Sequence, residues 1–178
     1  MDLLSQRGGT AVSVAEIARA AGLSRQAVYL HFADRADLLA AVAQYVDERS
    51  GLAGELPRVS DAPSGVAALR ELVALHAQTN PEVWPVARVF EALRRVDAAA
   101  ERSWQERQER RLEGVRQVVA RLREEGALRA GLEPGAAADL LWTLTSLHVW
   151  EDLVVVRGWS EERYRRHIAA LAVGTLTS

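Results

Sequence analysis

Between Ser13 and Leu39, the apolar positions divide the chain into three short predicted helices. In the first, apolar residues recur every three or four positions, which gives a helix one apolar face. Ser13 and Glu16 form a capping box at its start, in which the hydroxyl and the carboxylate each accept a backbone N–H. Gly22 ends this helix, because glycine adopts the left-handed conformation without a steric penalty.

The second predicted helix begins at Ser24, a residue type favoured at helix N-termini. It buries Val28 and Phe32 and keeps a polar face on its other side. Two short helices joined by a glycine turn, the second with a polar face, are typical of the helix-turn-helix motif. The second helix of that motif lies in the major groove of DNA. Asp34 then caps a third helix, which we expect to reach about Arg49.

Every segment downstream of a predicted loop at 51–64 also has helical periodicity. We predict helices at 64–79, 81–95, 98–125 and 133–156, and a last helix opened by Ser160. The Asn80-Pro81 step ends the first of these, and Gly126 caps the third. The fold class is therefore all-α, with a three-helix head at 1–49 and a helical domain at 50–178.

The last two predicted helices carry more apolar surface than a monomer can cover. From Leu140 onward, the segment that ends near 156 is apolar on nearly all sides, which predicts burial on nearly all sides. A two-fold dimer in which these helices pair with their copies as a four-helix bundle is the economical arrangement. The predicted dimer interface consists of Leu144, Leu147, Tyr164, Ile168 and Leu171.

Composition limits the possible environments and partners. The chain has 178 residues, 49% of them hydrophobic, no cysteine, and a net charge of −2. No apolar run is long enough to span a membrane, so we expect a soluble, cytoplasmic protein. Residues 1–40 contain four arginines and four acidic residues, whereas DNA-binding modules usually have a basic excess. Attraction to phosphates must therefore come from local placement of the arginines and from helix N-termini.

The polar face of the second helix carries side chains that can contact bases. Arg25 can pair with guanine and Gln26 with adenine through two hydrogen bonds each, and Leu30 can touch a thymine methyl group. A solvated helix face is the alternative interpretation of the same residues.

The segment IARAAGLSRQAVYLHFADRADLL closely resembles the DNA-binding domain of TetR-type transcriptional regulators. The features that match are Ile17-Ala18, Ala21-Gly22-Leu23-Ser24, Tyr29, His31-Phe32 and Leu38-Leu39. The resemblance implies that a further set of side chains contacts phosphates, namely Ser13, Ser24, Tyr29, His31 and Arg35. It also implies a homodimer, an effector pocket in the second domain, and a third helix that acts as a lever between pocket and head. A complete first helix precedes this point in the family, but here Gly8-Gly9 interrupt it. Either the true start lies further upstream, or the protein works with a short first helix.

A second set of candidate functional residues is mostly aromatic. Four of the five tryptophans lie in segments that, by the resemblance, enclose the effector pocket. Such a pocket, with mostly apolar walls and a few polar groups, suits a small hydrophobic or aromatic ligand. The predicted pocket residues are His76, Trp84, Phe90, Trp104, Trp142, Thr145 and His148. An aromatic stripe that belongs to the core is the alternative.

Catalysis has little support in the sequence. His148, Glu151 and Asp152 lie within two helical turns and could bind a metal. However, no second cluster completes a metal site, and neither a glycine-rich phosphate loop nor a nucleophile elbow is present. We therefore expect no enzyme activity, no metal and no cofactor.

The sequence predicts a regulator, a repressor that a small hydrophobic or aromatic effector releases from a palindromic DNA operator. Two alternatives stay open. One is a helical dimer that binds a small molecule but binds DNA weakly or not at all. The other is a regulator without an effector, which acts through an architectural role or a protein partner.

Overall fold

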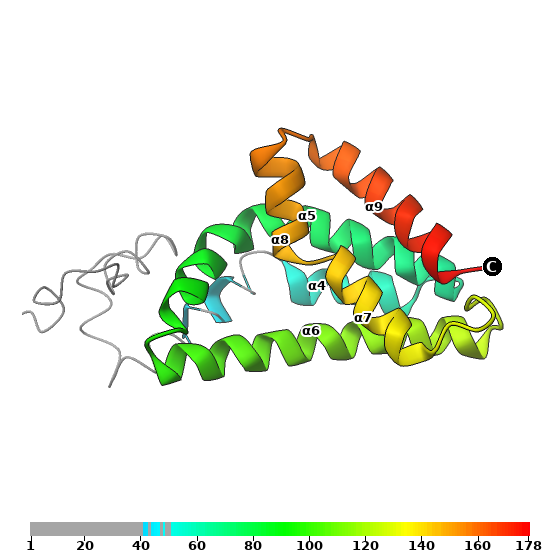
Figure 1. Cartoon of the computed structure of the whole chain (residues 1–178), viewed down its shortest axis with the longest axis horizontal. Coiled ribbons are helices and arrows are strands. Elements are labelled where there is room, and N and C mark those ends of the chain that lie inside the picture. Colours follow the sequence, from blue (N-terminus) through cyan, green and yellow to red (C-terminus); the bar gives the residue numbers. More distant parts are fainter. Residues whose placement is uncertain (1–40, 43, 47, 49–50) are drawn as a thin grey trace, which may run out of the picture. The chain divides into compact units, whose positions relative to one another are not determined.

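The computed structural model describes residues 41–42, 44–46, 48 and 51–178, and these residues form helices joined by short connections (Figure 1). The elements are α4 (Leu52–Ser60), α5 (Gly65–Leu93), α6 (Ala98–Glu124), α7 (Pro134–Leu144), α8 (Leu147–Trp150), the π-helix η1 (Glu151–Val156) and α9 (Glu161–Leu176). The predicted all-α class is confirmed. Within this part of the chain, the only extended pairing is an isolated bridge between Leu128 and Thr177. The predicted helix-turn-helix lies outside the described residues.

The chain divides into two compact units. One contains the described residues of 41–48 together with Glu82–Gln108, and the other contains Gly51–Pro81 and Glu109–Ser178. We call them the lever unit and the C-terminal unit. The described positions of 41–48 are helical, as predicted, and Val42 and Val46 are buried one turn apart.

The prediction of a loop at 51–64 is wrong for most of that segment, because α4 occupies Leu52–Ser60. Gly51 precedes it with a φ of 72°, a conformation that favours glycine. Pro57 removes one backbone donor from the helix, yet its carbonyl still accepts the Asp61 N–H at 2.8 Å. An ion pair of 2.9 Å between Arg58 and Glu71 joins α4 to α5. These contacts stabilise a helix that its proline and glycine content argued against.

The predicted break at Asn80-Pro81 is also wrong, since α5 continues from Gly65 to Leu93. Pro81 and Pro85 each remove a backbone donor from its ladder. Apolar packing compensates: Leu75, Ala77, Val83 and Val86 are buried on the two sides of Pro81, and the Thr79 hydroxyl donates to the Leu75 carbonyl at 2.9 Å. Local proline chemistry alone therefore predicted two helices where packing supports one.

In the C-terminal unit, α5 begins against the last turns of α6. A Cβ placed on Gly65 would lie 3.0 Å from the Leu122 backbone nitrogen, so only glycine fits without displacement. The Gly65 N–H donates to the Glu125 carboxylate at 2.6 Å. Arg121 holds the same carboxylate at 2.9 Å and donates to the Ala62 carbonyl at 2.6 Å. These contacts fix the start of α5 on α6.

The contact between Glu125 and Gly65 predicts a pH-dependent stability. The Gly65 N–H, and after it Arg121, lower the pKa of the Glu125 carboxyl below its usual 4.5. The stabilisation is therefore complete above pH 4.5 and is lost as the pH falls through the lower pKa of the folded state. Glu125→Gln should be less stable than the wild type at pH 7, and the difference should shrink at pH 3. Urea unfolding at both pH values measures it.

Glu124→Gln is the matched control for that measurement, because Glu124 is the exposed last residue of α6, one position before Glu125. It should have little effect on the free energy of unfolding. A Glu125→Gln penalty that is equal at pH 7 and pH 3 would contradict the prediction.

The end of α6 agrees with the prediction. Gly126 adopts a φ of 68°, and the N–H groups of Ala127 and Leu128 both donate to the Leu122 carbonyl. The chain then meets the C-terminal residues, where Arg129 donates from its backbone to the Leu176 carbonyl at 2.8 Å.

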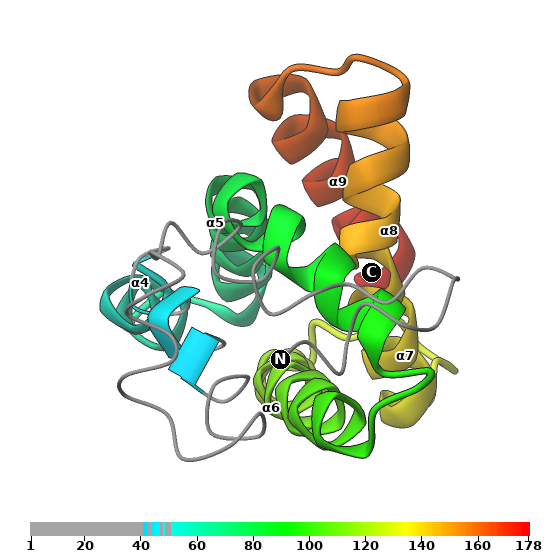
Figure 2. The ribbon, with the colours of Figure 1, turned by 90° about the vertical axis from the view of Figure 1, so that its left-hand side faces the viewer.

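The predicted single helix at 133–156 is three consecutive pieces. The first piece, α7, ends at Leu144. The Ser146 hydroxyl caps the second piece, α8, by accepting the Val149 N–H at 3.2 Å, and η1 follows α8 directly. Ser160 caps α9 as predicted, by accepting the Arg163 N–H at 3.2 Å. The chain reverses between η1 and α9, so that α9 packs against η1 and α7 (Figures 1 and 2). No helix in the described part is long and apolar enough to cross a membrane.

Candidate functional site

A small apolar cavity lies inside the lever unit. Its volume is about 20 Å³, which is room for about one water molecule. The helix at 41–48, α5 and α6 all contribute to its walls. The lining residues are Val46, Val83, Val86, Ala87, Phe90, Ser103, Trp104 and Arg107.

Two of the predicted pocket residues, Phe90 and Trp104, line this cavity. Trp84 belongs to the same unit but does not line it, and the Arg88 guanidinium lies 5.6 Å from the centre of its ring. Likewise, the Arg94 guanidinium lies 5.3 Å from the centre of the Trp104 ring. The sequence did not predict Val46 as a pocket residue.

The other four predicted pocket residues lie in the C-terminal unit. His76 is half-buried on α5, and His148 is exposed on α8. Trp142, on α7, has the Arg111 guanidinium 4.5 Å from its ring centre, and Arg111 also donates to the Trp142 carbonyl. Thr145 is buried, and its hydroxyl donates to the Leu141 carbonyl at 2.9 Å. The seven residues are thus divided between the two units, three in one and four in the other.

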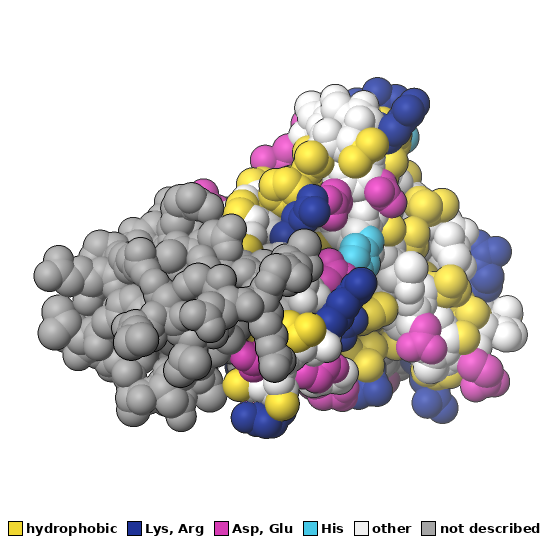
Figure 3. All heavy atoms as spheres, turned by 60° about the vertical axis from the view of Figure 1, so that its left-hand side comes forward, with side chains coloured by type: hydrophobic (Ala, Val, Ile, Leu, Met, Phe, Trp, Pro, Cys, Tyr) yellow, Lys and Arg dark blue, Asp and Glu magenta, His cyan; other side chains and the backbone are white. Residues whose placement is uncertain are grey.

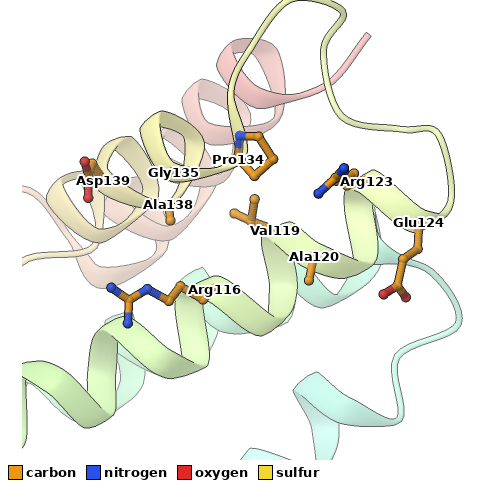
Figure 4. Close-up of a pocket in the computed structure, with 9 residues that line it drawn as sticks. All are labelled: Arg116, Val119, Ala120, Arg123, Glu124, Pro134, Gly135, Ala138 and Asp139. Atoms are coloured by element: carbon orange, nitrogen blue, oxygen red, sulfur yellow. The ribbon is translucent and has the colours of Figure 1, made fainter.

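A surface groove of about 740 Å³ lies between α6 and the first half of α7 (Figure 4). Val119 of α6 points toward α7 at its centre, where Ala138 is also buried. Arginine and acidic side chains line its sides. The complete lining is Arg116, Val119, Ala120, Arg123, Glu124, Pro134, Gly135, Ala138 and Asp139. The sequence pattern did not predict this groove, because its two walls lie on different helices.

Apolar side chains are exposed on α7, η1 and α9. The large ones are Leu140, Val155, Val156 and Leu171, which we call the apolar patch. Val156 is the most exposed of these at 69%. Figure 3 shows hydrophobic side chains on this part of the molecule close to arginine side chains. The predicted burial of 133–156 on nearly all sides therefore does not hold within one chain.

The predicted dimer-interface residues differ in exposure. Tyr164 and Ile168 are buried inside the chain, and Leu144 and Leu147 are half-buried. Leu171 alone of the five is strongly exposed, at 52%. Tyr164 and Ile168 therefore contribute to the core of the single chain.

The predicted DNA contacts all fall at or before residue 35, outside the described residues. They are Ser13, Ser24, Arg25, Gln26, Tyr29, Leu30, His31 and Arg35.

Sequence comparison covers that region. Residues 1–42 match the family model described as bacterial regulatory proteins, tetR family. The chain is also 41% identical over 49 residues to the HTH-type transcriptional regulator AcrR of Shigella flexneri. Residues 1–42 of the chain are therefore similar to the tetR family. The alignment with AcrR covers 28% of this chain and 23% of AcrR, so it spans about a quarter of that relative.

Solved structures share the fold of this chain. A crystal structure described as a TetR-family transcriptional regulator from Rhodococcus sp. is 20% identical with a TM-score of 0.66, covering 94% of this chain and 88% of that one. The ketosteroid transcriptional regulator KstR2 of Mycobacterium tuberculosis is 17% identical, with a TM-score of 0.62 and coverage of 94% and 86%. NalD of Pseudomonas aeruginosa, the secondary repressor of the MexAB-OprM multidrug efflux pump, is 24% identical, with a TM-score of 0.61 and coverage of 96% and 88%.

Proposed function

We propose that this chain is a DNA-binding transcriptional repressor of the tetR family that a small hydrophobic or aromatic effector releases from a palindromic operator. The observation that carries the proposal is the match of residues 1–42 to the family model. The likeness to a protein named as an HTH-type transcriptional regulator supports it. In this proposal residues 1–49 bind DNA, and residues 50–178 bind the effector and form the dimer.

On the DNA side, Arg25 and Gln26 read base edges in the major groove. Ser13, Ser24, Tyr29, His31 and Arg35 contact phosphates, which set the register of the complex. Because residues 1–40 carry no net charge, we expect few counterions to be released on binding.

On the effector side, the cavity in the lever unit supports the proposal. It joins Phe90 and Trp104 to Val46, which lies on the helix that follows the DNA-binding residues. A ligand larger than one water molecule must displace these side chains, and Val46 transmits that displacement to the helix. The switch works only if the effector binds one arrangement of that helix better than the other.

On the partner side, the apolar patch supports a two-fold homodimer. A closed dimer places the same surface of both copies in contact, so one patch covers its copy. Leu171 belongs to this patch and to the predicted interface, whereas Leu140, Val155 and Val156 extend that interface.

Fluorescence anisotropy with the duplex upstream of the protein's own reading frame tests DNA binding. The full chain should prefer this duplex over a scrambled one, with an affinity that falls as salt rises. Arg25→Ala should weaken specific binding by about tenfold or more, because it removes a two-hydrogen-bond base contact. Arg123→Ala, in the groove of the C-terminal unit, is the matched control and should bind as the wild type does. Equal binding to both duplexes would overturn the proposed repressor and favour the alternative of a helical small-molecule-binding dimer.

Val156→Asp tests the dimer in the same assay. A charge within the apolar patch should convert the dimer to a monomer, as measured by sedimentation. It should also weaken operator binding, because two separate monomers then bind the two DNA half-sites independently. Val96→Asp is the matched control, because Val96 is an exposed valine of the lever unit, outside the patch. A wild type that sediments as a monomer would contradict the dimer.

A further inference from the structure

The groove between α6 and the first half of α7 has charged side chains at both of its ends and apolar residues between them. Arg123 lies at the end where α7 begins, and Arg116 and Asp139 lie at the opposite end (Figure 4). Val119 and Ala138 line the middle, and both are buried. Every lining residue belongs to the C-terminal unit, so the groove lies within one unit.

The end of the groove that contains Asp139 carries a negative charge. Arg116 forms ion pairs with two carboxylates of its own helix, with Glu109 at 3.0 Å and with Glu113 at 3.9 Å. Its positive charge is therefore already balanced. Within the described part of the chain, the Asp139 carboxylate has no ion-pair or hydrogen-bond partner.

The other end presents a positive charge. The Arg123 guanidinium has no ion-pair or hydrogen-bond partner among the described residues, and it lies on the side of α6 that faces α7 (Figure 4). Glu124 also lines this end, but its side chain points away from α7. Arg116 and Arg123 are two turns apart on α6, which separates the two ends by about 10 Å.

Opposite charges at the two ends of an apolar groove complement an elongated zwitterion. The volume of the groove, about 740 Å³, lies in the usual range of small-molecule sites. A guanidinium binds a carboxylate through two parallel hydrogen bonds, and a carboxylate accepts hydrogen bonds from an ammonium group. A chain of methylene groups between the two charges would cover the apolar middle of the groove.

We propose that this groove is a binding site for an elongated zwitterion. Arg123 holds its carboxylate, Asp139 holds its ammonium group, and its apolar chain lies across Val119 and Ala138. The site is additional to the apolar cavity of the lever unit, and its ligand belongs to a different chemical class from the proposed effector. The inference goes beyond the proposed function and does not depend on DNA binding.

Titration of the full chain with ω-aminocarboxylates, from aminobutanoate to aminodecanoate, tests the proposal. The NMR signal of the Gly135 amide, which lines the groove, reports binding at this site. Affinity should be greatest near aminooctanoate, because its extended chain spans about two helical turns. Octanoate and octylamine carry one charge each and should bind about two- to fivefold more weakly, the usual contribution of an exposed ion pair. Equal affinities for these three probes would overturn the proposal.

Exchange of the two charges tests their roles. Arg123→Asp and Asp139→Arg should each weaken aminooctanoate binding by about fivefold or more, because each leaves two like charges in the groove. The double variant should recover the affinity, because the zwitterion then binds in the reverse direction. Both side chains are exposed, so the melting temperature should be unchanged in all three variants.

Arg166→Asp is the matched control, because Arg166 is an exposed arginine of the same unit that does not line the groove. It should bind aminooctanoate as the wild type does. A double variant that binds no better than the single variants, or a Gly135 amide that responds to none of the probes, would overturn the site. Operator binding without zwitterion binding would overturn the groove and leave the repressor standing, whereas the reverse result would do the opposite. The two failures are therefore distinguishable.

Discussion

Leu122→Ala is expected to lower the free energy of unfolding by about 2–5 kcal/mol, the range for removing a buried leucine side chain. Leu122 is 0% exposed and lies on α6 at the point where α5 begins. Its loss leaves a cavity that the surrounding side chains cannot fill, because Gly65 holds the backbones of the two helices close together there. The melting temperature should fall by roughly 4–20 °C, as measured by calorimetry.

Leu56→Ala is the matched control for this prediction. Leu56 lies in the same unit, and its side chain is 49% exposed. Its replacement should change the free energy of unfolding by no more than about 0.5 kcal/mol, as for most surface positions. Similar losses for the two variants would mean that the contact between α5 and α6 is not the centre of the core of this unit.

Gly65→Val is expected to destabilise the protein by about 1–3 kcal/mol through overpacking. A Cβ at this position lies 3.0 Å from the Leu122 nitrogen and 3.1 Å from its Cα. Both are backbone atoms, so no change of side-chain rotamer relieves the contact. The displacement also lengthens the bond from the Gly65 N–H to Glu125. Urea unfolding measures the loss.

A glycine in open surroundings should respond with the opposite sign. Gly114 lies in the interior of α6, and a Cβ built there meets no atom within 4 Å. Gly114→Ala should therefore stabilise the protein by up to about 1 kcal/mol, because alanine restricts the unfolded chain and favours the helix. A stabilising Gly65→Val would show that the close approach of α5 to α6 is absent in solution. A destabilising Gly114→Ala would show that the surroundings of Gly114 on α6 are not open.

Some residues of the candidate sites could be predicted from the sequence, and others could not. Phe90 and Trp104 were predicted to line a pocket, and they line the cavity of the lever unit. Tyr164 was predicted as an interface residue because it lies on the apolar face of its helix, α9. It is instead buried within the chain, and its hydroxyl has no hydrogen-bond partner. The pattern of a helix shows which residues share a face. It does not show whether that face meets the same chain, a second copy or a ligand.

The ends of helices could be predicted where they depend on neighbouring residues, and were wrong where they depend on packing between distant segments. Ser160 and Gly126 act as predicted, because a cap depends on a few neighbouring residues and their hydrogen bonds. The two errors at prolines, α4 and the middle of α5, arose because packing outweighs the loss of one backbone hydrogen bond.

By itself, the sequence determined the all-α class, the resemblance of its first residues to the tetR family, the helix caps and the residues expected to contact DNA, because each depends on short-range spacing or on a motif within one segment. Only the tertiary structure decided which apolar residues remain exposed in the patch, that α5 is continuous, and that Arg111 lies over Trp142. Those properties depend on contacts between residues far apart in the chain, and helical periodicity carries no information about which helices meet.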